Sequence, residues 1–216
     1  MTRRLTIIPV LLIVFFIFGI VFSWFHFFPP WRDYSLFILV KVTIPEGYTL
    51  EDIADKFKPF KNFNQDNFFR ITKDKEGYLF PDTYFLSGNE TEEKIVKIME
   101  ENFKKKAGQI NPKVLVIASL LEKESKITEE RKIISGILWK RLKADMPLQV
   151  DAEPDTYLYK GLPPAPICNP GLDSIGAALN PVESKYWYYL HDKKGIIHYA
   201  KTFEEHKINK EKYLNY

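Results

Sequence analysis

The sequence predicts an α+β protein in which an amino-terminal transmembrane helix precedes a small αβ subdomain and a larger domain of mixed helix and sheet. Three observations support this prediction. Residues 5–28 form an apolar run without Asp, Glu, Lys or Arg. A β-branched stretch followed by an amphipathic helical pattern comes next. Three further helical patterns are then followed by a proline-rich segment and a pair of short strand patterns.

The apolar run is long enough to cross a bilayer. Its length of about 24 residues spans roughly 36 Å as a helix, and a hydrocarbon core is about 30 Å thick. A cleaved signal peptide would have a shorter apolar region ending in small residues, whereas this run ends in the aromatic stretch 24–28. We therefore expect a single uncleaved anchor in the cell membrane. Arg3 and Arg4 should keep residues 1–4 in the cytoplasm, with the rest of the chain outside.

Composition limits the partners and the redox chemistry of the chain. The net charge is only +3, and lysines and glutamates are interspersed, so we expect no nucleic-acid partner. We also expect no cofactor. Cys168 is the single cysteine, which excludes an internal disulfide. His191, His198 and His206 lie close together in sequence, but they lack HExxH-type spacing, so we expect no metal site.

The small subdomain is expected at residues 36–74, after a linker at 29–35. Leu36 to Pro45 reads as a strand, and a helix should follow with Thr49 as its N-cap and Asp52 three residues later. This strand and helix resemble a LysM-like unit, a fold that many cell-wall proteins use. Either the unit is a purely structural module, or it contacts glycan.

The larger domain, residues 75–216, contains an acidic helix end. Helices are expected at 91–107, 112–125 and 127–143. In a helical projection of the second, Glu124 lies inside the apolar arc beside Ile117, and Glu122 lies outside it. Burial would raise the pKa of the Glu124 carboxyl, as a general acid requires. Alternatively, the helix frays and both glutamates are solvated.

Two segments surround this helix in sequence and carry polar or aromatic side chains. The stretch from Met146 to Gly171 holds six prolines, so it cannot be ordinary helix or central strand. Such a stiff loop is a common place for a site, and it carries Gln149, Asp151, Asp155, Tyr157, Tyr159 and Asn169. An earlier turn at Pro81-Asp82 is flanked by clustered aromatics, which suit either a core or a sugar platform: Tyr78, Phe80, Tyr84 and Phe85.

Several motifs together resemble those of the endolytic murein transglycosylases, the MltG or YceG-like family. They are, in order, EGYLFPDTY, ASLLEKES, MPLQVD, TYLYKGLPPAPICNPG, AALNP and HYAKTFEEH, and they span nearly all of residues 76–206. The resemblance implies a lyase that cleaves the β-1,4 bond between N-acetylmuramic acid and N-acetylglucosamine and leaves a 1,6-anhydromuramyl end. It places the catalytic glutamate at Glu124.

Further residues are expected to support Glu124 or to bind the sugar. Ser125 completes a Glu-Ser pair like that of other lytic transglycosylases, and His198 lies in the last motif of the family. Expected sugar contacts also include Gln149, Asp151, Tyr157 and Asn169, each of which has loop bracing as its alternative. The resemblance further implies glycan strands as substrate and peptidoglycan synthases as partners. Independently of the resemblance, the strand patterns at 186–192 and 195–200 predict a hairpin.

The sequence also departs from the family pattern. Only Ala152 to Asp155 separate two motifs that usually lie further apart, so the strand-length preference is open. Two other functions remain. A tethered glycan-binding protein would not need Glu124, and a hydrolytic muramidase would need a second carboxylate, for which Asp151 is the candidate.

Overall fold

The computed structural model describes residues 16–24 and 39–214. Residues 16–24 are helical. The remainder of the expected transmembrane helix at 5–28, and the linker at 29–35, lie outside the described residues. Among the helices that the structure describes, none is both long enough and apolar enough to cross a membrane.

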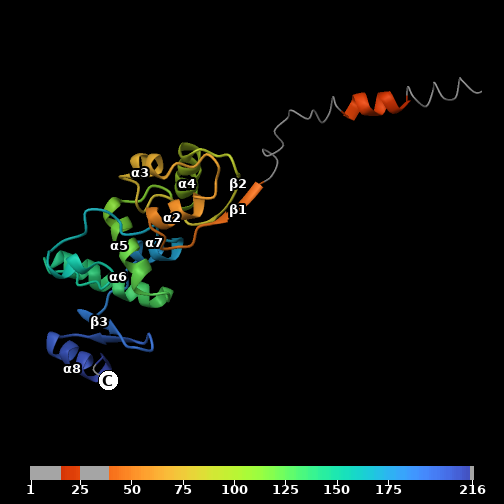
Figure 1. Cartoon of the computed structure of the whole chain (residues 1–216). Helices are drawn as coiled ribbons and strands as arrows, with labels where there is room; N and C mark the ends of the chain where they lie inside the picture. Colours follow the sequence, from red (N-terminus) through yellow and green to blue (C-terminus); the bar gives the residue numbers. More distant parts are fainter. Residues whose placement is uncertain (1–15, 25–38, 215–216) are drawn as a thin grey trace, which may run out of the picture.

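The first folded unit has a β-α-α-β order. It consists of β1 (Leu39–Thr43), α2 (Leu50–Phe57), α3 (Gln65–Thr72) and β2 (Thr83–Ser87). The strands pair antiparallel with Val42 opposite Tyr84, and α2 lies closer to this pair than α3 does in Figure 1. Ile53, Phe57 and Phe68 are completely buried in the core of the unit.

Local signals explain part of this unit. The side chain of Thr49 accepts from the amide of Asp52, and the Asp52 carboxylate accepts from the amide of Thr49, so the expected capping box at α2 is confirmed. Helix α3 was not predicted from the sequence, although Phe68 and Thr72 lie buried on one face of its eight residues. The boundary drawn at residue 74 falls inside the unit, since β2 pairs with β1 across it.

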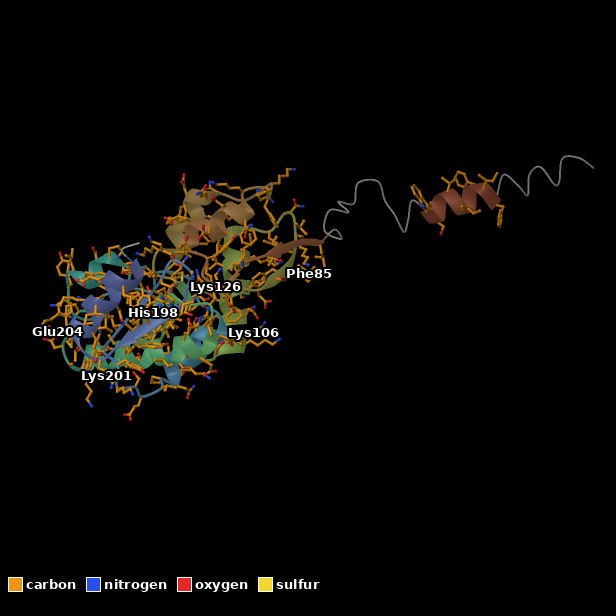
Figure 2. The ribbon with its side chains drawn as sticks, turned by 90° about the horizontal axis from the view of Figure 1, so that it is seen from below. Phe85, Lys106, Lys126, His198, Lys201 and Glu204 are labelled. Carbon is orange, nitrogen blue, oxygen red and sulfur yellow. The ribbon has the colours of Figure 1, made fainter. Side chains whose placement is uncertain are left out.

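The aromatic cluster around Pro81-Asp82 mostly belongs to the interior. Phe80 and Tyr84 are buried, and the Tyr84 hydroxyl donates to the Phe80 carbonyl at 2.5 Å. Phe85 is 62% exposed and projects from the edge of the folded unit (Figure 2). The core interpretation therefore holds for Phe80 and Tyr84 and fails for Phe85.

Helix α4 (Glu92–Ala107) joins this unit to the helical core. Thr91 occupies the expected N-cap position, although its side chain makes no capping hydrogen bond. Ile95 and Met99 pack into the core of the first unit, and Phe103 packs into the core of the second. One helix thereby supplies side chains to both apolar cores.

The second core is helical. It is formed by α5 (Pro112–Glu124), α6 (Thr128–Lys143) and α7 (Leu172–Leu179). The expected helices at 112–125 and 127–143 are confirmed to within one residue at each end. Figure 1 shows these three helices in the middle of the folded chain.

The chain ends in a hairpin and a helix. The hairpin consists of β3 (Tyr188–His191) and β4 (Ile197–Ala200), and α8 (Phe203–Leu214) follows it. The antiparallel pairing confirms the expected hairpin, with strands shorter than the sequence pattern. In Figure 1 this part lies at the opposite end of the helical core from the β-α-α-β unit.

Gly136 marks a close backbone approach between α6 and the segment after α7. A Cβ atom at this position would lie 2.0 Å from the carbonyl oxygen of Val182. The amide of Val182 donates to the Lys132 carbonyl at 3.0 Å, which holds this segment against the helix. Only glycine leaves room for that contact.

We expect Gly136→Ala to destabilise the protein, although alanine is the better helix former. The clash should cost about 1–3 kcal/mol, more than the gain of about 1 kcal/mol from helix propensity. Gly176→Ala in α7 is the matched control, because a Cβ there meets nothing within 4 Å. Urea unfolding should show opposite signs for the two variants, and equal midpoints would contradict the close approach.

Candidate active site

Glu124 is the last residue of α5 and is half-buried. Its Oε2 accepts a hydrogen bond from the Tyr189 hydroxyl at 3.0 Å, and its Oε1 accepts one from the Ala152 amide at 3.3 Å. The carboxyl is therefore held between strand β3 and the proline-rich loop. It lies on the inward side of the helix, as the helical projection predicts.

The environment raises the pKa of the Glu124 carboxyl above its ordinary value. Burial is the main cause, since it disfavours the charged form, and the nearby charge of Asp151 adds to it. The hydrogen bonds from Tyr189 and Ala152 act in the opposite direction, because they stabilise the carboxylate. The balance leaves a carboxyl that keeps its proton to higher pH than a solvated glutamate.

Tyr189 was not among the residues expected at the site. Burial and the adjacent Glu124 carboxylate raise the pKa of its phenol far above the usual range, so the hydroxyl remains a hydrogen-bond donor. The residue lies in the aromatic run from Tyr186 to Tyr189. Strand alternation would have separated that run into two faces, but only the fold shows that one face meets Glu124.

Asp151 and Tyr157 form the exposed rim of the site. The Tyr157 hydroxyl donates to the Asp151 carboxylate, and Tyr157 is 42% exposed. Burial first, and then the bond to Asp151, raise the pKa of the phenol. Because Asp151 directly precedes Ala152, both expected residues lie beside Glu124 in the structure.

Gln149 holds the start of this loop. Its backbone has a positive φ of 53°, and its side-chain oxygen accepts from the Arg141 guanidinium at 3.0 Å. Arg141 is 3% exposed and also donates to the carbonyls of Leu148 and Trp187, at 2.8 and 2.7 Å. One buried cation thus joins the loop to the residue preceding β3, and Gln149 serves in this brace.

Ser125 and Asn169 make bracing contacts in the structure, and a sugar contact by either residue remains a prediction. The Ser125 hydroxyl donates to Glu130 at 2.6 Å and accepts from the Ile127 amide at 3.0 Å, which shapes the α5–α6 turn. The Asn169 side chain has no exposed surface. It accepts from the Leu79 amide and donates to Tyr48 and Glu76 at the junction with the first unit.

His198 lies on β4 in contact with the end of the chain. Its Nε2 is 3.0 Å from a carboxylate oxygen of Asp192, and its ring stacks on Tyr213 at 3.6 Å. These contacts brace the hairpin against α8. A sugar contact by His198 remains a prediction.

Glu122 is not the solvated residue that the helical projection indicates. Its Oε1 lies 2.8 Å from Nη2 of Arg131, and both side chains are only 6% exposed. Its Oε2 accepts from the Gly171 amide at 2.9 Å. The projection treats α5 as an isolated helix, whereas α6 and the end of the proline-rich loop cover this side of it.

Taken together, the fold and the site define an α+β protein with one half-buried carboxyl at the end of a core helix, held by two hydrogen-bond donors. The chain matches the model of the YceG-like family over residues 33–154 and 155–212. It belongs to that family.

Similar proteins carry a name that agrees with this family. A protein of Streptococcus pneumoniae serotype 2 (strain D39 / NCTC 7466), named endolytic murein transglycosylase, is 28% identical over 249 residues, or 82% of this chain and 45% of that protein. A protein of the same name from Bacillus subtilis (strain 168) is 33% identical over 174 residues, covering 65% and 48%. The chain spans about half the length of these curated relatives.

A solved structure supports the fold. The crystal structure of a yceG-like protein from Listeria monocytogenes aligns with a TM-score of 0.63 at 28% sequence identity. The alignment covers 78% of this chain and 75% of the other.

The ion pair between Glu122 and Arg131 yields a stability prediction. Glu122→Ala should lower the free energy of unfolding by about 3–5 kcal/mol, because it leaves the Arg131 charge buried without its partner. Glu129→Ala is the control, since the Glu129 side chain is 76% exposed in its pair with Lys132 and should contribute at most about 0.5 kcal/mol. Thermal melting of both variants measures the difference, and similar melting points would argue against the buried pair.

Tyr189 yields a prediction about ionisation. Tyr189→Phe removes a donor that stabilises the carboxylate, so the pKa of Glu124 should rise further above its ordinary value. The titration of a ¹³C-labelled Glu124 carboxyl by NMR measures this directly. Tyr186→Phe in the same aromatic run should leave the titration unchanged, because that ring stacks on Tyr199 instead. A lower pKa in Tyr189→Phe would show that the hydroxyl does not support the carboxylate.

Proposed function

We propose that this chain is a membrane-anchored lytic transglycosylase of peptidoglycan glycan strands, with Glu124 as its catalytic residue. The substrate bond is the β-1,4 linkage between N-acetylmuramic acid and N-acetylglucosamine, and the product carries a 1,6-anhydromuramyl end. The names of the relatives support the reaction class.

The observation that carries the proposal is the environment of Glu124. A general acid near neutral pH needs a carboxyl with a raised pKa, and burial provides that here. The carboxyl also needs a fixed orientation, which the donors on Tyr189 and Ala152 supply. Of the carboxyls with a raised pKa, Glu124 lies beside the exposed rim of Asp151 and Tyr157, where a glycan can approach.

One carboxyl suffices for this reaction. Glu124 in its protonated form gives its proton to the glycosidic oxygen as the bond from C1 of the muramyl sugar breaks. The C6 hydroxyl of the same sugar then bonds to C1, and the Glu124 carboxylate takes the hydroxyl proton. The carboxyl ends in its starting state, and an intramolecular nucleophile needs orientation more than activation.

The position of Asp151 keeps the hydrolytic muramidase as a second candidate. A hydrolase needs another carboxylate to act as nucleophile or to activate water. Asp151 is close enough to Glu124 to affect its ionisation. However, it accepts a hydrogen bond from Tyr157 on the exposed rim, which occupies one of its oxygens.

Further parts of the proposal concern location and partners. The apolar segment at 5–28 would anchor the enzyme in the cell membrane, and retention in the membrane fraction at high salt tests this. The β-α-α-β unit would serve as the LysM-like subdomain. An enzyme anchored in the cell membrane would limit the length of nascent glycan strands beside peptidoglycan synthases.

Product analysis with the full chain tests the reaction. Purified glycan strands should yield 1,6-anhydro ends by mass spectrometry, and Glu124→Gln should reduce the rate by about 10²- to 10⁴-fold while folding is preserved. Reducing ends would identify a muramidase instead, and the absence of products would leave a glycan-binding protein.

Glu129→Gln is the appropriate control. Glu129 is an exposed residue of α6, so the same chemical change there should leave turnover intact. Glu122 is unsuitable as a control, because its ion pair with Arg131 is buried. Full activity in Glu124→Gln would rule out its role as the acid.

A further inference from the structure

A cavity of about 480 Å³ lies in the proline-rich loop, on the side of the turn that follows Ala152. Its walls begin at Glu153, which is the next residue after the amide that binds Glu124. The volume falls within the range of about 300–1,000 Å³ that is usual for small-ligand sites. The chain that forms the cavity therefore continues directly from the residue that binds Glu124. Asp155 and Tyr159, two of the residues that the sequence singled out in this loop, line the cavity.

The cavity walls combine two kinds of surface. One kind is apolar and includes the Tyr159 ring, which is 68% exposed, together with Leu162 and neighbouring prolines. The other kind is polar and includes Glu153, Asp155 and Lys160. A pyranose ring presents C–H groups on its faces and hydroxyls around its edge, so it matches such a surface.

Hydrogen bonds within the chain hold both ends of the loop that forms the cavity. The buried Thr156 hydroxyl accepts from the Val150 amide at 2.8 Å and donates to the Glu153 carbonyl at 2.6 Å, which ties the turn together. The Ile167 amide donates to the Ser119 hydroxyl on α5 at 3.0 Å, which ties the far end to the core. A cavity held in this way loses little conformational entropy on binding.

Gly161 keeps one wall of the cavity open. Its backbone has a φ of +93°, and a Cβ atom there would meet nothing within 4 Å. The turn thus requires glycine for its conformation, and the space beside it is free for a ligand.

The charges in the cavity favour an uncharged sugar. Glu153 and Asp155 would repel a carboxylate, and the ammonium group of Lys160, which also lines the cavity, is paired with Asp145 at 2.6 Å. N-acetylglucosamine carries no charge, whereas a free lactyl group on N-acetylmuramic acid does. The acetamide methyl group also suits the apolar side of the cavity near Leu162.

We propose that this cavity is a glycan subsite that binds an uncharged N-acetylhexosamine unit, with the Tyr159 ring as its stacking platform. The proposal rests on the proposed function, because it gives the same glycan substrate a second contact on the loop whose Ala152 amide binds Glu124. Tyr159 would contact the sugar, whereas the Tyr157 hydroxyl donates to the Asp151 carboxylate.

The test measures binding without turnover. The full chain with Glu124→Gln, in a polyoxyethylene detergent that carries no sugar, is titrated with the β-1,4-linked trimer of N-acetylglucosamine by calorimetry. Adding Tyr159→Ala should raise the dissociation constant about tenfold, because the contact between the sugar and the ring is lost. Tyr159→Phe should retain the affinity, because the ring remains.

Leu158→Ala is the matched control. Leu158 is the adjacent residue and is 73% exposed, but it does not line the cavity. Its loss should leave the dissociation constant within about twofold. Saturable binding with this pattern supports the subsite, whereas no saturable binding, or equal affinity in Tyr159→Ala, overturns it.

The outcome can be separated from that of the proposed function. If anhydro products form but the trimer does not bind, the subsite fails while the lyase stands. If the trimer binds with the expected pattern and no products form, the subsite proposal holds and the chain is a glycan-binding protein.

Discussion

The burial of helix α5 is the constraint on which the rest of the structure depends. Every residue from Leu115 to Leu121 is buried, so other elements surround this helix along most of its length. Ser119 shows how closely the chain returns to it, since its hydroxyl and its carbonyl accept from Ile167 and Cys168 in the proline-rich loop. The two glutamates at the end of the helix therefore contact residues of the neighbouring elements. Glu122 meets a cation and becomes a structural ion pair.

The fold could be predicted from sequence where local rules decide it. The capping box at Thr49, the boundaries of α5 and α6, and the hairpin all follow from spacing within one element. The β-α-α-β unit could not be delimited in this way, because β2 joins it through a pairing with β1 about 40 residues earlier. Helix α3 was missed because its eight residues are too few for a periodic pattern to be clear, and its stability depends on contacts with neighbours such as the Phe63 ring, which packs on Phe68.

The site could be predicted only in part, for the same reason. Periodicity placed Glu124 on the inward face, and that prediction needed no other element. The donor on Tyr189 lies 65 residues further along the chain, and no local pattern indicates which carboxyl it meets. The interior position of Asn169 is equally non-local, because its partners at Tyr48 and Glu76 come from the first folded unit. The polar residues that the sequence singled out in the proline-rich loop thus form two groups. Some face outward, and the others hold the loop in place.

The two donors to Glu124 differ in how readily a change of sequence can alter them. The Tyr189 hydroxyl belongs to a side chain, so its effect on the carboxyl is open to substitution. The Ala152 amide belongs to the backbone, so every residue except proline supplies it, and its position depends on the turn. That turn is short because only Ala152 to Asp155 separate Asp151 from Thr156, and Thr156 binds its backbone from within. The shortened segment, which sequence alone marked as a departure from the family, is therefore the part of the chain that brings a backbone donor to the carboxyl.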